Sequence, residues 1–300
     1  MKILLLGKNG QVGWELQRSL VPLGEVIALN SESSEYCADF TNLAGLAQTV
    51  RSIAPDIIVN AAAHTAVDKA ESEPELVRTI NALATGVLAQ EAKRSNAWLI
   101  HYSTDYVFDG NGQKPWLETD ATAPLNVYGA TKLEGEQLIR QSSCKHLLFR
   151  TSWVYGARGG NFAKTMLKLA RERDSLNVIN DQIGAPTGAD LLADITAHAI
   201  RTAQSRPEVA GLYNLVAAGE TSWHGYASFV IEHARRMGIA IKVPNDAIKP
   251  VPTSAFPTPA RRPLNSRLDT AKLQHTFALH LPHWQAGVER MLTEVLANGG

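Results

Sequence analysis

Two side chains spaced four residues apart could act together as a proton donor. Tyr128 and Lys132 stand in a stretch with helical apolar spacing, 128–139, and an i, i+4 pair shares one helix face. An ammonium about 4 Å from a phenol, at an effective dielectric constant of about 20, contributes roughly 4 kcal/mol, which is about three pKa units. The lysine would therefore bring the pKa of the phenol, ordinarily about 10, toward neutrality, where a proton donor is most effective.

This spacing also arises by chance, so its meaning depends on a second motif near the N-terminus. Three glycines in the order GxxGxxG, Gly7, Gly10 and Gly13, lie where a predicted strand, 3–6, leads into a predicted helix, 11–20. Glycine permits a tight turn and lets the backbone approach a pyrophosphate at a helix N-terminus. We therefore predict a dinucleotide site that includes Gly7, Gly10, Gln11, Val12 and Gly13.

The end of the second predicted strand bears on which dinucleotide is used. An acidic residue about 20 residues after the glycine loop would bind the adenosine ribose. Here the strand ends at Asn30, followed by Ser31 and Glu32. Lys8, inside the glycine loop, either pairs with a 2′-phosphate or lies in solvent. The sequence therefore predicts use of both NADPH and NADH or a preference for NADPH, with Asn30 at the site.

Short apolar runs alternate with helical patterns along the chain. Runs that are apolar on both faces and separated by helices are typical of a parallel sheet covered on both sides, with ligands at the carboxyl ends of its strands. The predicted strands are 3–6, 26–29, 57–59, 98–100, 147–149 and 212–216, and the predicted helices are 11–20, 43–53, 74–94, 128–139, 161–173, 191–201, 269–277 and 284–296. The predicted fold class is α/β, a doubly wound parallel Rossmann sheet with a smaller C-terminal substrate-binding lobe.

The chain is expected to divide into two parts of unequal size. The dinucleotide-binding Rossmann domain is predicted over 1–155, with a returning strand and helix near 188–218. The smaller substrate-binding lobe is predicted over 156–187 and 219–300. A chain of 300 residues can bury a large core in this way without a disulfide or a metal.

Composition excludes several classes of function. The chain has 29 lysines and arginines against 29 aspartates and glutamates, so it lacks the basic footprint of a nucleic-acid-binding protein. Its two cysteines, Cys37 and Cys144, have no metal-binding spacing and are predicted to be free thiols in a reducing compartment. The N-terminal apolar run is too short for a signal or membrane segment. We therefore expect a cytoplasmic protein with no nucleic-acid or membrane partner.

Taken together, these motifs resemble the extended short-chain dehydrogenase/reductases over essentially the whole chain. That family uses a Ser/Thr, a Tyr and a Lys, and the matching residues are Thr104, Tyr128 and Lys132. The resemblance implies that the side chain of Lys132 also binds the nicotinamide ribose, and that His64 acts through its backbone more than its ring. Besides the glycine loop and Asn30, the implied cofactor-binding residues are Asp39, Phe40, Ala61, Ala62, Ala63, His64, Thr65, Tyr102, Tyr128 and Lys132.

The segment 103–110, together with 60–71, 150–155 and 181–187, resembles the members of that family that reduce a 4-keto nucleotide sugar. Related dehydratases place an Asp-Glu pair after the catalytic threonine, whereas this chain has Asp105 and then Tyr106. Elimination therefore lacks its base, and reduction needs none. The implied reaction transfers hydride from the nicotinamide to the sugar C4 carbonyl while Tyr128 donates the proton. The implied substrate-binding residues are Thr104, Asp105, Trp153, Asn161 and Arg262.

The resemblance leaves two other activities open and adds a metal. A regulatory subunit of methionine adenosyltransferase resembles these reductases but works by binding its partner; the intact triad argues against that reading. A sugar-nucleotide epimerase, in which the cofactor is regenerated, is the second alternative. The reductases are expected to be homodimers, some with Mg²⁺ at the interface, and the resemblance would place Glu15 and Asp190 near that ion.

Overall fold

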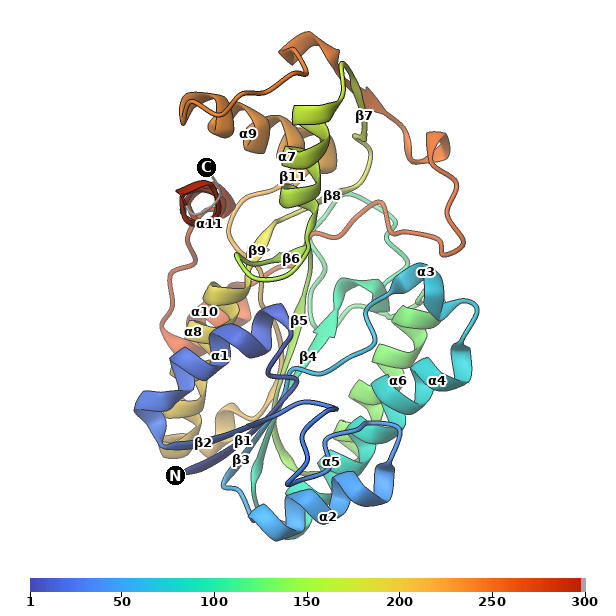
Figure 1. Cartoon of the computed structure of the whole chain (residues 1–300). Helices are drawn as coiled ribbons and strands as arrows, with labels where there is room; N and C mark the ends of the chain where they lie inside the picture. The colour runs from blue at the N-terminus through green and yellow to red at the C-terminus, as the bar shows by residue number, and fades with distance from the viewer. Residues whose placement is uncertain (298–300) are drawn as a thin grey trace.

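Six parallel strands form the central sheet of the computed structural model, which describes residues 1–297 (Figure 1). Their order across the sheet is β10-β5-β4-β3-β1-β2. Because the chain passes from β1 outward to β2 and then returns to β3 on the other side, a topological switch point lies between β1 and β3, where ligands bind in such sheets. The strands are β1 (Lys2–Leu6), β2 (Glu25–Leu29), β3 (Ile57–Asn60), β4 (Trp98–Thr104), β5 (Lys145–Thr151) and β10 (Gly211–Asn214).

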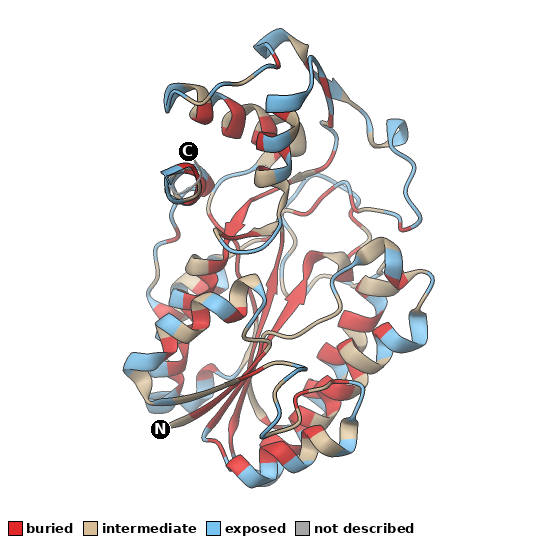
Figure 2. Cartoon of the chain, in the orientation of Figure 1, coloured by how far each residue is buried: buried red, intermediate tan, exposed pale blue. Residues whose placement is uncertain are grey.

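Helices cover both faces of the sheet, and this confirms the predicted doubly wound parallel fold (Figure 2). Along β1 the side chains alternate: Ile3 and Leu5 pack toward one layer of helices, and Leu4 and Leu6 toward the other. The first layer contains α1 (Gln11–Leu20), α8 (Ala189–Ser205) and α10 (Ala271–Phe277), and the second contains α2 (Leu43–Ile53), α5 (Ala84–Ser95) and α6 (Val127–Ser142). The strands are therefore apolar on both sides, as their sequences indicated.

The single helix predicted over 74–94 is wrong in its middle. The structure has α4 (Pro74–Arg78), a π-helical turn η2 (Thr79–Leu83) and then α5. A π turn inserts an extra residue and turns the following side chain to a new direction, which apolar spacing does not reveal. Here the turn carries Asn81, which is 1% exposed. Two short helices precede and follow this region, α3 (Val67–Ala70) and η3 (Asp105–Val107).

The C-terminal lobe packs three helices around an aromatic core above the sheet (Figure 1). These are α7 (Phe162–Glu172), α9 (Trp223–Arg236) and α11 (Trp284–Ala297). Within the proline-rich stretch 244–263, for which the sequence predicted no strand or helix, the structure forms β12 (Ile248–Val251), which pairs with β7 (Leu176–Ile179). The remaining short elements are β6 (Val154–Tyr155), β8 (Ile183–Gly184), β9 (Thr187–Gly188), β11 (Thr221–Ser222), η1 (Val21–Leu23), η4 (Pro207–Val209), η5 (Asn245–Ala247) and η6 (Thr253–Ala255). Within residues 1–297, no helix is long and apolar enough to cross a bilayer.

Candidate active site

The glycine loop brings the backbones of β1, α1 and the segment after β3 into close contact. Gly7 has φ +89°, and a Cβ there would lie 2.7 Å from the backbone nitrogen of Ala62. A Cβ on Gly13 would lie 2.0 Å from the carbonyl oxygen of Gly7, so no other residue fits. Gly10 caps α1 without a side chain, which leaves the first turn of the helix open to a ligand. The loop therefore has the form that a bound pyrophosphate needs.

A cavity of about 420 Å³ opens beside this loop, at the carboxyl ends of β1, β2 and β3. It spans the switch point between β1 and β3, where the fold places a ligand. Of the predicted cofactor-binding residues, the structure places these around it: Gly7, Gly10, Asn30, Asp39, Phe40, Ala61, Ala62, Ala63 and His64. The other predicted residues of the cofactor site do not line this cavity: Gln11, Val12, Gly13, Thr65, Tyr102, Tyr128 and Lys132.

Three of those others have defined positions elsewhere. Val12 packs against the core, and Thr65 is exposed. Tyr102 points to the opposite side of the sheet, where its hydroxyl lies 2.6 Å from Thr196 Oγ1 of α8. The phenol of Tyr102 is therefore a core group, and only its backbone carbonyl reaches the candidate site.

Asn81 holds the segment that lines the cavity, although no sequence pattern pointed to it. Its Oδ1 accepts a hydrogen bond from the His64 backbone nitrogen at 2.9 Å, and its Nδ2 donates to the His64 carbonyl at 3.1 Å. Both backbone groups of His64 are thus fixed by one side chain from the π turn. That His64 acts through its backbone more than its ring stays a prediction. The only signal in the sequence is an asparagine inside an otherwise apolar helical pattern.

Replacing Asn81 with alanine is expected to raise the Kd for NADPH about tenfold, because the wall of the cavity loses its fixed backbone and about 1.4 kcal/mol of binding corresponds to tenfold. The measurement is a fluorescence titration with NADPH. Asn214→Ala is the matched control: Asn214 is also buried, and its Nδ2 bonds two backbone carbonyls, of Trp116 and Asp269. The control should lose stability and keep its NADPH Kd; equal weakening in both variants would count against the Asn81 role.

The Thr104 and Tyr128 side chains meet where β4 ends against the first turn of α6. Thr104 Oγ1 accepts from the Tyr106 backbone nitrogen at 3.2 Å and is hydrogen-bonded to Tyr128. Asn126 caps α6, its Oδ1 accepting from Gly129 N at 2.8 Å, and this cap fixes the turn that carries Tyr128. β4 and α6 therefore bring together two members of the predicted triad, Thr104 and Tyr128.

The predicted effect of Lys132 on Tyr128 is wrong in this conformation. The Lys132 Nζ lies 2.6 Å from the Tyr102 carbonyl oxygen and 3.1 Å from His101 Nε2. Burial raises the pKa of Tyr128 to about 12, only partly opposed by the hydrogen bond with Thr104. Burial also lowers the pKa of Lys132 to about 8, against the attraction of Glu136. An i, i+4 spacing puts two residues on one helix face, but it does not decide which acceptor a long flexible amine chooses.

Asp105 is a buried carboxyl group beside the triad. Its Oδ1 accepts from Thr104 Oγ1 at 3.1 Å, while its Oδ2 is buried without a hydrogen-bond partner. Burial raises the pKa of Asp105 to about 7, opposed by hydrogen bonds with Ser266 and Thr104. The group is thus partly protonated near neutrality and has an unused oxygen, as a substrate-contacting residue would.

Asp105→Asn is expected to change the pH dependence of stability. The pKa of Asp105 is about 7 in the folded chain against an ordinary 3.8. Because the folded pKa is raised, this group's stabilising contribution is complete below about pH 4 and is lost as the pH rises through 7. Between about pH 4 and pH 7, the unfolding free energy of the wild type should therefore fall relative to that of the variant by up to about 1.4 kcal/mol per pH unit. Urea denaturation from pH 4.5 to 8 measures this, and a constant difference would contradict the raised pKa.

The other predicted substrate-binding residues come from the C-terminal lobe and its connections. Trp153 has φ +49°, uncommon for a bulky residue, and its ring stacks on Trp223 with centroids 3.7 Å apart. Asn161 caps α7, and its Nδ2 donates to the Gly156 carbonyl at 2.7 Å, so its amide is engaged within the chain. Arg262 pairs with Asp68 at 2.7 Å. Contact of these residues with substrate stays a prediction.

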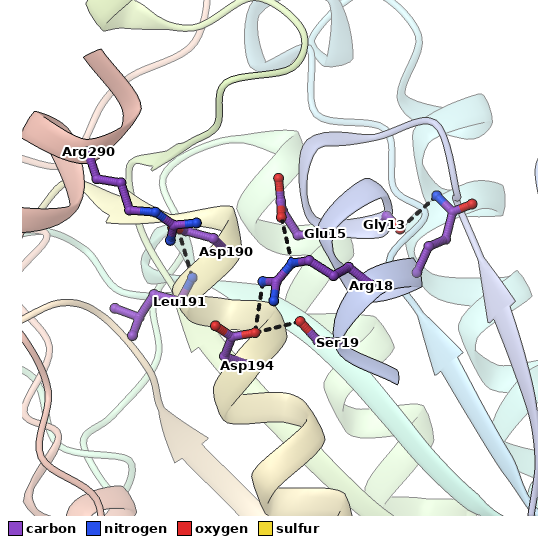
Figure 3. A network of polar contacts seen from close by, with 9 residues as sticks. Gly13, Glu15, Arg18, Ser19, Asp190, Leu191, Asp194 and Arg290 are labelled. Carbon is purple, nitrogen blue, oxygen red and sulfur yellow. Dashed lines mark hydrogen bonds and ion pairs between the residues drawn. The ribbon is translucent and has the colours of Figure 1, made fainter. Parts of the chain in front are cut away.

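The acids predicted near a metal are paired with arginines (Figure 3). Asp190 Oδ2 lies 2.6 Å from Arg290 Nη1, and its Oδ1 accepts from the Leu191 backbone nitrogen. Glu15 Oε2 lies 3.6 Å from Arg18 Nε, and burial followed by the charge of Asp190 raises the pKa of Glu15. No group of three potential ligand side chains occurs among residues 1–297. Each acid already has an arginine contact, and no third ligand side chain is grouped with the two of them among residues 1–297, so the arrangement does not support the magnesium prediction, and no reaction step is assigned to a metal.

The fold and this site define a Rossmann-type NAD(P)-dependent oxidoreductase of the short-chain dehydrogenase/reductase class. The model of the family described as RmlD substrate binding domain matches residues 1–297, and the chain belongs to this family.

Named relatives extend this assignment over the whole chain. It is 64% identical over 295 residues to the dTDP-4-dehydrorhamnose reductase of Escherichia coli K12, with 98% of each chain covered. It is 46% identical to that of Burkholderia thailandensis, covering 99% of this chain and 100% of the relative. A crystal structure of the Bacillus anthracis reductase in complex with NADP has a TM-score of 0.88 and 35% identity, covering 98% of this chain and 99% of that one.

Proposed function

We propose that this chain reduces the 4-keto group of dTDP-4-dehydro-L-rhamnose to give dTDP-L-rhamnose, using NADPH or NADH. The observation that carries the proposal is the meeting of Thr104, Tyr128 and Asp105 at the end of β4, the neighbour of β3, at whose carboxyl end the cavity opens. The identity of 62–64% to reductases named for this reaction supports the substrate. The product would serve the synthesis of cell-surface polysaccharide.

Each residue of the triad has a defined task in this reaction. NADPH, when bound, supplies the hydride that reduces the carbonyl carbon. Tyr128 donates the proton to the resulting oxygen, and Thr104, hydrogen-bonded to that phenol, stabilises the developing alkoxide. Lys132, once it reaches the phenol as an ammonium, lowers the pKa of Tyr128 and binds the nicotinamide ribose. Dehydration is disfavoured because Tyr106, whose ring packs edge-on against Tyr128 at 5.6 Å, replaces the second carboxylate.

We propose separate roles for the two parts of the chain. The Rossmann part, 1–155 with the strand and helix near 188–218, binds the cofactor, and the lobe formed by 156–187 and 219–300 binds the nucleotide sugar. Trp153, Asp105, Asn161 and Arg262 are the proposed substrate contacts. We further propose a cytoplasmic homodimer that binds neither nucleic acid nor membranes, in keeping with a net charge of zero.

The test is NADPH oxidation with dTDP-4-dehydro-L-rhamnose, compared with the unepimerised 4-keto precursor and with the UDP analogue. We expect stoichiometric cofactor consumption and the highest kcat/KM with the first substrate. Turnover without net consumption would identify an epimerase, and stable partner binding without turnover would identify a regulatory subunit. Comparing kcat/KM for NADPH and NADH tests the role of Lys8, which a strong NADH preference would contradict.

A further inference from the structure

A buried chain of hydrogen bonds links two strands and one helix directly beneath the candidate site. It consists of Asn60 at the end of β3, His101 on β4 and Lys132 on α6, which are 1%, 1% and 2% exposed. The Asn60 Nδ2 lies 3.0 Å from His101 Nδ1, and Lys132 Nζ lies 3.1 Å from His101 Nε2. Nothing in the reaction as described above uses His101. His101 lies between the Asn60 amide and the Lys132 amine, within hydrogen-bonding distance of both.

The orientation of Asn60 decides which ring nitrogen of His101 carries the proton. Asn60 Oδ1 accepts a hydrogen bond from the Ala62 backbone nitrogen at 3.1 Å, and a backbone N–H can only donate. The Asn60 Nδ2 must therefore be the atom that faces His101, and it too can only donate. His101 Nδ1 is then the acceptor, so a neutral imidazole carries its proton on Nε2. That Nε2–H points at Lys132 Nζ.

An ammonium cannot satisfy this arrangement. It has three donors and no acceptor, so it would meet the Nε2–H donor to donor. A neutral amine accepts from His101 Nε2–H through its lone pair and still donates to the Tyr102 carbonyl at 2.6 Å. Every hydrogen bond of the chain is then made, which matters because an unpaired donor at this depth is costly.

We propose that His101 holds Lys132 as a neutral amine against the Tyr102 carbonyl in the cofactor-free protein, and so sets when the lysine becomes an ammonium. His101 is a positioning residue that acts through Lys132, and its relevance to catalysis rests on the function proposed above. Since Tyr128 needs a nearby ammonium to release its proton readily, Lys132 must leave His101 and gain a proton before the chemical step. A bound cofactor would offer ribose hydroxyls to the amine and so draw it away from His101, and the proton it then gains would come from solvent.

The surrounding charges agree with this state. Among the described residues, Glu136 on α6 is the acid that attracts the Lys132 charge, and its carboxylate is already bonded to Arg150 at 2.6 Å and to Ser103 at 2.5 Å. Asn60 from β3 and the Tyr102 carbonyl from β4 are uncharged, and Tyr128 is a neutral phenol. Burial lowers the pKa of Lys132 from 10.5 to about 8, which moves the lysine toward the neutral amine that the hydrogen bonds select. Burial also lowers the pKa of His101 well below its ordinary value, which keeps the ring neutral.

The first test reads the tautomer of His101 directly and does not depend on activity. In ¹⁵N-labelled cofactor-free protein, the His101 ring can be assigned among the nine histidines through its bonded Cβ. We expect a neutral ring protonated on Nε2 at pH 8 and no imidazolium down to pH 6. A ring protonated on Nδ1, or an imidazolium at pH 7, would overturn the proposal even if the chain proves to be the reductase proposed above.

The second test is the pH profile of kcat/KM in His101→Gln. The glutamine can turn its amide oxygen toward Lys132, which favours the ammonium, so the alkaline limb should move to higher pH by on the order of one unit. His146→Gln is the matched control, because His146 lies on the neighbouring strand β5 and its pKa is also lowered by burial, but it bonds the Cys144 carbonyl rather than the lysine. An unmoved limb in His101→Gln, or an equal shift in both variants, would refute the positioning role.

Discussion

Replacing Tyr128 with phenylalanine is expected to lower kcat by about 10²- to 10⁴-fold, the usual contribution of a positioned proton donor. The substitution removes the hydroxyl that is hydrogen-bonded to Thr104. The phenyl ring of the variant can keep the packing of Tyr128 against Tyr106, so the loss should be one of chemistry rather than of structure. NADPH binding should change little, because the cavity that would hold the adenosine half is lined by other residues. Steady-state rates of NADPH oxidation at saturating substrate give kcat, and a fluorescence titration gives the Kd.

A second tyrosine supplies the control for this prediction. Tyr213 on β10, two strands from β4, is also buried, and its hydroxyl donates to the Val209 carbonyl at 2.7 Å within the core layer that contains α8. Tyr213→Phe should cost about 1 kcal/mol of stability through that lost hydrogen bond and leave kcat within a few-fold. If Tyr128→Phe turned over at nearly the wild-type rate, Tyr128 would not be the proton donor.

The sequence was sufficient for the parts of the site that the backbone forms. Glycine spacing predicted the close approach of Gly7 and Gly13, because no side chain fits where those backbones touch. Apolar runs predicted the parallel sheet, since strands buried on both faces have no polar side. Thr104 and Tyr128 meet as expected because a strand end and a helix start are fixed by the fold. The glycine loop and the sheet could be predicted because residue type alone restricts the local backbone conformation and burial.

What the sequence did not predict depends on side-chain choice deep in the packing. Lys132 bonds Tyr102 and His101 instead of the phenol, because its long side chain reaches these buried hydrogen-bonding groups. Asn81 reaches the cavity wall only because a π turn rotates it, and apolar periodicity carries no trace of that turn. Arg290 reaches Asp190 from a helix 100 residues away. Pairings of this kind require the coordinates of both partners.

Replacing Arg150 with methionine is expected to lower the free energy of unfolding by about 3–5 kcal/mol, because a buried carboxylate would be left without its cation. Arg150 Nη2 lies 2.6 Å from Glu136 Oε2, and the two side chains are 3% and 2% exposed. The same carboxylate accepts from Ser103, the neighbour of Thr104 on β4. The pair therefore ties β5 and α6 to the strand end that carries the triad, and kcat should fall together with stability.

A second ion pair that involves α6 serves as a control for the effect of burial. Arg78 pairs with Glu134 at 2.7 Å in a similar two-pronged contact, but both side chains reach solvent. Arg78→Met should therefore change stability far less than Arg150→Met, since exposed pairs contribute little. In the double variant Arg150→Met/Glu136→Leu the isolated charge is gone, and much of the lost stability should return. Equal destabilisation in the two arginine variants, measured by urea unfolding, would show that burial does not set the cost.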